Sequence, residues 1–206
     1  ANRHAEWQIM LSILLPRADA FLVSSSPRTA AFYRASSGAR IGDKISFESR
    51  IRTASKSRNG NMVALSSDGG VTRIYDTKSL EVVGPEIKGQ TFKRLVLHPT
   101  GRFVAGHSRD GWSLWDARTG RMVHALSKAT SGERAVAFSP NGRWLIVGRD
   151  TPSGPALDFM RLTDGSDLKV LHTFQLPESK LHSYDLDDIN QLLFTHDSRL
   201  LFVLGD

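Results

Sequence analysis

The sequence of 206 residues contains no cysteine. Disulfide bonds, thiolate metal sites and cysteine nucleophiles are therefore excluded for this chain. Because disulfide bonds form and persist mainly in oxidising compartments, a chain without any fits a reducing one. We expect a cytoplasmic location on that basis.

Long apolar runs are also lacking. The best run near the start, residues 9–15, contains Ser12 and is soon followed by Arg17. It is much shorter than the roughly 18 apolar residues that a membrane-spanning helix needs. Only Arg3 and His4 precede it as basic residues, and no small-residue cleavage pattern follows it. We therefore expect neither a membrane span nor a secretory signal peptide in this sequence.

Blocks of like charge are absent, although the chain is basic. It has 27 Lys and Arg residues against 21 Asp and Glu residues, which gives a net charge of +6. A basic balance suits acidic peptides, phosphate groups or nucleic acid as partners. The cations are scattered along the chain, so a solvated, arginine-rich surface explains the composition as well. Charge alone identifies no partner.

Known catalytic motifs are missing as well. The sequence contains no G-x-S-x-G, H-E-x-x-H or P-loop pattern, and its seven histidines are dispersed. Nothing places two carboxylates across a cleft. We therefore expect a protein that is not an enzyme and that holds no cofactor and no metal.

An internal repeat is the strongest feature that is present. Turn-like segments recur at intervals of 41 residues, and the same interval occurs three times before a fifth copy follows after 56 residues. The repeated positions are Asp19, Gly60, Gly101, Gly142 and Ser198. A fixed period of this size is typical of solenoids and propellers. The longer last interval indicates an insertion between residues 174 and 188.

Each repeat has four short apolar runs separated by turn residues. In the second unit the runs are Ile51–Ser57, Met62–Ser67, Val71–Tyr75 and Glu81–Ile87. In the third they are Phe92–His98, Phe103–His107, Trp112–Trp115 and Arg121–Leu126. In the fourth they are Arg134–Ser139, Trp144–Val147, Ala156–Leu162 and Leu168–Phe174. Such runs predict β-strands, and four strands in about 40 residues predict the blade of an all-β propeller.

The repeats resemble those of the WD40 β-propeller family. Residues 136–143 (VAFSPNGR) are similar to the first strand and turn of such a repeat. Ser113-Leu114-Trp115-Asp116 carries the Trp-Asp pair of the family, and residues 73–76 (RIYD) carry a common variant. The resemblance covers nearly the whole chain and is strongest over residues 51–150. It implies a rigid scaffold of four-stranded antiparallel blades.

The repeats also depart from the family pattern. The Gly-His pair that usually precedes the first strand is reduced to Gly89-Gln90 in one repeat and is absent elsewhere. The buried His-Ser/Thr-Asp-Trp hydrogen-bond network of the family therefore cannot form in its usual way. Asp68, Asp110 and Asp150 occupy the turns before third strands, where we expect them to cap those turns through the backbone.

The number of repeats predicts an incomplete ring within a single domain spanning 1–206. We expect blades at about 7–47, 51–88, 92–128 and 134–174, with a partial blade at 188–206. A ring of this family usually needs about seven blades. An open arc leaves apolar blade faces and strand edges uncovered. We therefore expect that the chain is a fragment, or that further blades are disordered or come from a second chain.

The candidate binding residues lie where innermost strands begin and in the longest loop. Arg52, Lys93 and Arg134 each stand eight residues before a turn glycine, so three successive blades would aim a cation at the channel mouth. Converging cations suit a carboxylate, a phosphate or an acidic peptide. The alternative is a polar position that stays solvated. Trp112 and the loop 175–187, which contains His182 and Tyr184, complete the candidate set.

The function expected from this resemblance is a scaffold that binds a protein or peptide, with an acidic partner as one option. Two alternatives stay open. The chain could be the non-catalytic sensor or gating propeller of a larger enzyme linked to a kinase or a peptidase. It could also associate with nucleic acid or another polyanion through its basic surface, in which case binding would depend steeply on salt.

Overall fold

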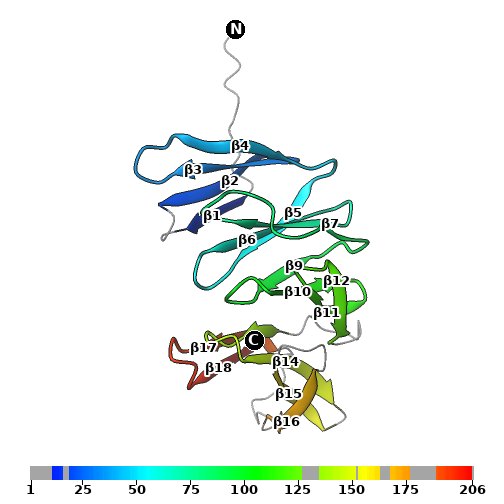
Figure 1. Cartoon of the computed structure of the whole chain (residues 1–206). Coiled ribbons are helices and arrows are strands. Elements are labelled where there is room, and N and C mark those ends of the chain that lie inside the picture. The colour runs from blue at the N-terminus through cyan, green and yellow to red at the C-terminus, as the bar shows by residue number, and fades with distance from the viewer. Residues whose placement is uncertain are drawn as a thin grey trace.

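The computed structural model describes residues 11–15, 19–126, 135–151, 153–162, 168–176 and 189–205. All the regular elements in these ranges are β-strands, which form five antiparallel sheets (Figure 1). The predicted all-β fold class is therefore confirmed. No helix in these ranges is long and apolar enough to cross a bilayer.

Four of the sheets have four strands each, in sequence order or its reverse. Sheet 1 contains β1 (Leu11–Leu15), β2 (Ala20–Ser26), β3 (Thr29–Arg34) and β4 (Arg40–Ser46). Sheet 2 contains β5 (Ile51–Lys56), β6 (Met62–Ser67), β7 (Val71–Asp76) and β8 (Ile87–Lys88). Sheet 3 contains β9 (Arg94–Leu97), β10 (Phe103–Ser108), β11 (Gly111–Asp116) and β12 (Arg121–Ala125).

Sheet 4 contains β13 (Val136–Phe138), β14 (Trp144–Thr151), β15 (Gly154–Arg161) and β16 (Lys169–Gln175). The fifth sheet, called the half sheet below, consists only of β17 (Ile189–Phe194) and β18 (Leu201–Gly205). Each sheet is built from consecutive strands, and β16 ends one residue past the expected fourth repeat range of 134–174. Antiparallel pairing joins each strand to the next along the chain, as short turns between strands require.

The repeated turn positions share one backbone conformation. Positive φ angles occur at Asp19 (46°), Gly60 (73°), Gly101 (76°), Gly142 (70°) and Ser198 (63°). Glycine adopts this left-handed conformation without a steric penalty, which explains why three of the five are glycine. The period that the sequence shows is therefore a period of turns between first and second strands.

A second set of contacts stabilises the same turns. Ser57 Oγ donates a hydrogen bond to Asn59 Oδ1 at 2.7 Å, and Ser139 Oγ donates to Asn141 Oδ1 at the same distance. Thr195 Oγ1 lies 2.6 Å from Asp197 Oδ1 in the half sheet. The hydroxyls also accept the amide that begins the second strand, as Ser57 Oγ does from Met62. These local bonds satisfy backbone groups that a bare turn would leave unpaired.

Sheet 3 carries His98 where sheets 2 and 4 carry serine. The Thr100 amide donates to His98 Nδ1 at 3.2 Å, so the proton of the neutral ring lies on Nε2, which donates to the Gly142 carbonyl at 3.0 Å. This contact joins sheet 3 to the next turn along the arc. Burial lowers the pKa of His98 from its ordinary value of 6.5, the Gly142 carbonyl opposes that shift, and the positive charge of Arg102 adds to it.

The hydrophobic core lies between successive sheets. Alternate residues of a strand point to opposite faces, so β6 directs Val63 and Leu65 at sheet 1 and Ala64 at sheet 3. Val104 of β10 likewise packs toward sheet 2, while Ala105 packs toward sheet 4. Sheets 2 and 3 are therefore buried on both faces, and the core consists of a series of layers between sheets.

The arc is open within the described residues. Core clusters join sheets 1 and 2, sheets 2 and 3, sheets 3 and 4, and sheet 4 and the half sheet, but none joins sheet 1 to the half sheet. The half sheet packs one face on sheet 4 through Leu192. Its other face exposes Leu193, Leu200 and Phe202. The expected incomplete ring is therefore the arrangement seen.

The expected strand bounds differ most from the observed ones at two places. The predicted strand Glu81–Ile87 is reduced to β8, because Gly84 has a φ of 70° and Pro85 has no amide hydrogen to donate. Strand β14 continues past Val147 to Thr151, because it pairs with β15 all the way to Gly154. Turn residues define strand ends well only where the chain actually reverses.

Candidate functional site

Three connections meet at one end of sheets 2 and 3. They are the β6–β7 turn, the connection from β8 to β9, and the β10–β11 turn. In four-stranded antiparallel sheets the second turn and the link to the next sheet lie at the same end, so these segments share one rim. The Gly89 amide donates to the Gly70 carbonyl at 3.0 Å, and the Lys93 amide donates to the His107 carbonyl at 2.7 Å. These bonds tie the connection to both neighbouring turns.

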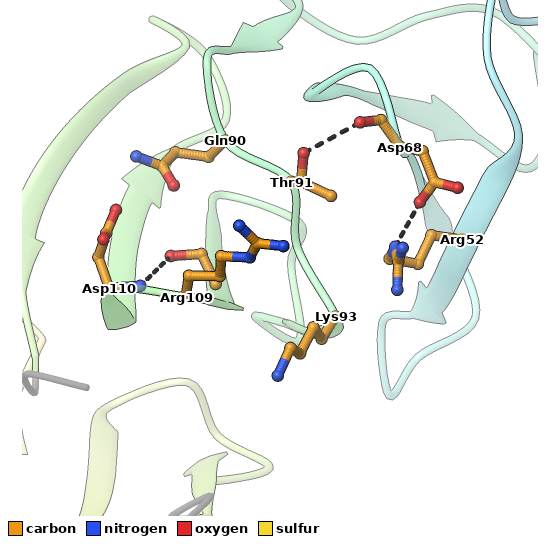
Figure 2. Close-up of a pocket in the computed structure, with 8 residues that line it drawn as sticks. Arg52, Asp68, Gln90, Thr91, Lys93, Arg109 and Asp110 are labelled. Atoms are coloured by element: carbon orange, nitrogen blue, oxygen red, sulfur yellow. Dashed lines mark hydrogen bonds and ion pairs between the residues drawn. The ribbon is translucent and has the colours of Figure 1, made fainter. Parts of the chain in front are cut away.

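A cavity of about 510 Å³ lies among these connections. Its lining residues come from sheet 2, from sheet 3 and from the segment between them. They are Arg52, Asp68, Gln90, Thr91, Lys93, Ser108, Arg109 and Asp110 (Figure 2). We call this cavity the rim pocket. All eight side chains are polar or charged, so the pocket suits a hydrated or ionic group more than an apolar ligand.

The sheet 2 side of the rim pocket is held by an ion pair. Arg52 Nε donates to Asp68 Oδ1 across the start of β5 and the β6–β7 turn. Thr91 Oγ1 donates to the Asp68 carbonyl at 3.1 Å, which attaches the connection to that turn. We expected Asp68 to cap its turn through the backbone, and the structure corrects this: its carboxylate holds Arg52. The ion pair positions the guanidinium at the pocket wall.

The sheet 3 side carries a cation and a carboxylate on adjacent residues. Arg109 extends from the β10–β11 turn toward the loop that carries Thr91 and Lys93 (Figure 2). Asp110 lies beside it, and its backbone amide donates a hydrogen bond to Ser108 Oγ at 3.2 Å. Three cations and two carboxylates line the pocket in total, and one carboxylate is already engaged by Arg52. Among the described lining residues, cations therefore outnumber carboxylates by one.

The structure brings together two of the six predicted site residues. Arg52 and Lys93 both line the rim pocket, on neighbouring sheets. Arg134, His182 and Tyr184 lie outside the described residues. Trp112 is placed differently from the expectation of a rim anchor: it is only 3% exposed and belongs to the core between sheets 3 and 4. An apolar indole on a strand between two sheets is removed from water.

Trp112 nevertheless reaches a second, smaller cavity. This cavity of about 260 Å³ is lined mainly by the innermost strands of sheets 2, 3 and 4 and of the half sheet. Its lining residues are Thr53, Arg94, Leu95, Val96, Trp112, Ala135, Val136 and Leu192. Thr53 and Arg94 directly follow Arg52 and Lys93, so the channel wall begins one residue after the rim.

Sequence reasoning missed Arg109 and Thr91. It considered only the starts of the innermost strands as sources of cations at the rim. The triplet Ser108-Arg109-Asp110 was nonetheless visible as the turn before a third strand, and such turns share the rim with those starts. A search of both classes of connection for cations would have included Arg109. Thr91 carries no comparable signal, because its role depends on a contact with the Asp68 backbone.

The chemistry of the rim pocket is that of ionic recognition. Within the described ranges, no group of three or more His, Asp or Glu side chains could hold a metal ion. The pocket offers guanidinium and ammonium groups, two hydroxyls, an amide and one carboxylate that is not paired to a described cation. Such a set can bind a carboxylate or phosphate while also contacting a basic or amide group beside it.

No protein-family model matches the chain. Part of the sequence resembles the meiotic recombination protein rec14 of Schizosaccharomyces pombe, with 31% identity over 113 residues. That match covers 54% of this chain and 37% of rec14. Autophagy-related protein 16 of Arabidopsis thaliana is 27% identical over 112 residues, which cover 52% of this chain and 22% of that protein. The matched segments thus span well under half the length of either relative.

Solved structures resemble the chain over nearly its full length. The β-propeller domain of Myceliophteria thermophila Cps50 (Swd1) matches 96% of the chain with a TM-score of 0.65 and 15% identity, over 63% of that domain. KlAtg21, in a complex with the coiled coil of AgAtg16, matches 100% of the chain with a TM-score of 0.67 and 15% identity, over 66% of its length. Kuenenia stuttgartiensis hydrazine synthase matches 95% with a TM-score of 0.64 and 16% identity, over 61% of its length. The chain therefore spans less than two thirds, or about two thirds, of the length of each of these matched chains.

Proposed function

This chain has the fold of a WD40-type β-propeller, and on that premise we propose that it is a scaffold that binds another protein and has no catalytic activity of its own. The bound segment carries an acidic group that enters the rim pocket between sheets 2 and 3. A cytoplasmic location is part of the proposal. The partner gains a rigid surface, because the rim connections are tied to both sheets by backbone hydrogen bonds.

The observation that carries this proposal is the convergence of charged groups in the rim pocket. Arg52 at the start of β5, Lys93 in the β8–β9 connection and Arg109 in the β10–β11 turn line one cavity of about 510 Å³. Ionic side chains from several loops on a rigid scaffold are a common arrangement for recognising a partner. Arg109 replaces Trp112 as an anchor in this proposal. Arg134, His182 and Tyr184 are kept as candidates for the same partner.

The comparisons support the type of function and not its details. One solved structure of the same fold is a complex, in which KlAtg21 is bound to the coiled coil of AgAtg16. A fold hosts many functions, so the partner of this chain has to be inferred from its own residues. The charge of the rim pocket favours an acidic segment over a basic or purely apolar one.

The proposal is tested with short random peptides displayed on phage. The chain is immobilised and the phage that bind it are selected, without any selection against a variant. We expect the surviving peptides to be enriched in Asp and Glu, and their synthetic forms to bind the double variant at least about tenfold more weakly, since two attractive contacts become repulsive.

The matched control is Arg40→Glu/Lys44→Glu, which makes the same change of charge on the exposed outer strand β4. Binding that falls equally in both double variants would show that the effect comes from the overall charge of the chain and not from the rim pocket. Peptides without acidic residues that bind the Lys93→Glu/Arg109→Glu variant normally would contradict the proposal. A labelled DNA duplex in the same assay tests the polyanion alternative, because its binding must fall steeply with added salt.

A second candidate is the non-catalytic propeller of a larger enzyme. The observation in its favour is the structural similarity to Kuenenia stuttgartiensis hydrazine synthase. In that case the rim pocket faces another domain or subunit of the enzyme. Mass spectrometry of the native protein, purified from its source, distinguishes the candidates: a catalytic domain in the same polypeptide or in a stable complex favours the enzyme assembly.

A further inference from the structure

A groove of about 430 Å³ opens on the opposite rim, between sheets 1 and 2. It is formed by turns between first and second strands and between third and fourth strands, whereas the rim pocket is formed by the other connections. Its lining residues are Ala20, Arg34, Ile41, Asn61, Thr77, Lys78 and Leu80. We call it the lower groove. It shares no residue with the rim pocket.

The lower groove exists because sheet 1 has a small residue at one position. Ala20, the first residue of β2, pairs with Arg34, the last residue of β3. The same position is Met62 in sheet 2, Phe103 in sheet 3 and Trp144 in sheet 4. Larger side chains at this position can extend toward the next turn along the arc. An alanine leaves that space empty.

The neighbouring interface shows what normally fills the space. A Cβ added at Gly101 would lie 2.4 Å from Met62 Cγ, so the Met62 side chain covers the turn of the following sheet. At Gly60, the equivalent turn glycine beside sheet 1, an added Cβ would have no atom within 4 Å. The lower groove is therefore the space that an aliphatic or thioether side chain occupies one sheet further along.

The floor of the groove is apolar and held in place. Leu80 has a φ of 63°, and its amide donates to the Asp76 carbonyl at 2.9 Å, which fixes the turn. A Cβ at Gly42 would lie 3.1 Å from Leu80 Cδ1, so the leucine packs closely on β4 beside Ile41. Both leucine and isoleucine remain partly exposed. Covering them would remove apolar surface from water.

Two cations flank the apolar floor. Arg34 and Lys78 are exposed, and in the described part of the chain neither makes an ion pair. The nearby carboxylates are engaged in the turns: Asp76 Oδ1 accepts the Lys78 amide at 2.8 Å, and Asp19 Oδ2 accepts the Ser36 hydroxyl at 2.7 Å. Arg34 itself stands where sheets 2 and 3 carry Asp76 and Asp116. Two exposed cations thus flank a space shaped for an apolar side chain.

We propose that the lower groove is a second binding site, which takes an extended peptide segment of a partner with a methionine- or leucine-sized side chain next to a carboxylate. The apolar side chain enters the space beside Ala20 and Gly60, and the carboxylate lies between Arg34 and Lys78. This site goes beyond the proposed function, since it is on the opposite rim and recognises an apolar group together with the charge. A partner could therefore be held at both rims of one arc.

The probe for this site is the peptide acetyl-Glu-Met-Glu-amide. It is titrated into the isotopically labelled chain while the amide NMR signals of Asn61, Thr77 and Lys78 are followed. We expect saturable shifts at these signals. Replacing methionine by alanine in the peptide should weaken binding about tenfold, because the buried side chain is lost. Replacing both glutamates by glutamine should weaken it about three- to fivefold, as expected for exposed ionic contacts.

The decisive variant is Ala20→Met. Its methionine side chain would fill the space that the side chain of the partner would otherwise occupy. We expect it to abolish the shifts while its melting temperature stays the same or rises by about 2–4 °C. If it does not fold, Arg34→Glu/Lys78→Glu takes its place, with Arg58→Glu as a control on the same rim. Unchanged binding by the Ala20→Met variant, or absence of shifts at the three amides in the parent chain, overturns the proposal. The Lys93→Glu/Arg109→Glu variant should bind this peptide as the parent chain does. The test of the lower groove is therefore independent of the test of the rim pocket.

Discussion

Sheets 2 and 3 differ from the half sheet in the number of sheets that pack against them. Sheets 2 and 3 are each covered on both faces, and Phe92 lies completely buried between them. The half sheet has sheet 4 on one face only, and Phe202 on its other face is 56% exposed. Both regions are built from the same repeat. The comparison teaches that the stability of a blade depends on neighbouring blades as much as on its own sequence.

The largest expected effect comes from truncating one phenylalanine in each of the two regions. Phe92→Ala should lower the free energy of unfolding by about 3–5 kcal/mol, since it leaves a cavity beside Trp115 and Gly106. Phe202→Ala should change it by no more than about 0.5 kcal/mol, because its ring is mostly solvated. Equilibrium unfolding in urea measures both values. Similar losses at the two positions would show that another surface covers the half sheet in solution.

A smaller effect is expected from placing alanine at turn glycines with different neighbours. Gly60→Ala should lower the free energy of unfolding by about 1 kcal/mol, because φ is positive and the space around it is open. Gly142→Ala should cost about 2–3 kcal/mol, because its Cβ would also lie 2.6 Å from His98 Nε2. Thermal unfolding followed by circular dichroism ranks the two variants. The reverse order would mean that His98 of sheet 3 does not pack on the Gly142 turn.

The smallest effect concerns pH and the histidine between sheets 3 and 4. The folded state lowers the pKa of His98, so at pH below 6.5 the unfolded chain binds a proton that the folded chain resists. Stability should therefore be complete above pH 6.5 and should fall as the pH drops below it, by at most about 1.4 kcal/mol per pH unit. Urea midpoints measured from pH 7.5 to 5.5 give this slope.

The control is His98→Ser, which restores the residue that sheets 2 and 4 carry at this position. It should flatten the pH profile in that range. A parent profile that does not change between pH 6.5 and 5.5, or a His98→Ser profile as steep as the parent, would contradict the contribution of His98. Thr195 holds the equivalent position in the half sheet, where no further sheet packs on it within the described residues.

Local features were predictable because they depend on short-range chemistry. Residues that tolerate positive φ mark the five repeated turns, and alternating apolar residues mark most strands of sheets 2 to 4. The outer strand of sheet 2 could not be predicted from apolar content, because Gly84 and Pro85 interrupt it. Of the site, Arg52 and Lys93 were found from their fixed distance to the turn glycines. Arg109 was missed because cations were sought only at the starts of innermost strands, although the turn that carries it is recognisable in the sequence.

The sequence by itself determined the blade. Its period of 41 residues, its turn glycines and its alternation of apolar residues specify four short strands and the faces that they bury, because these properties act over a few residues. Only the tertiary structure decided what lies between blades: the Arg52–Asp68 ion pair, the burial of Trp112 and the groove beside Ala20. Each of these joins residues of different strands or sheets, and a one-dimensional pattern carries no information on how side chains meet across such an interface.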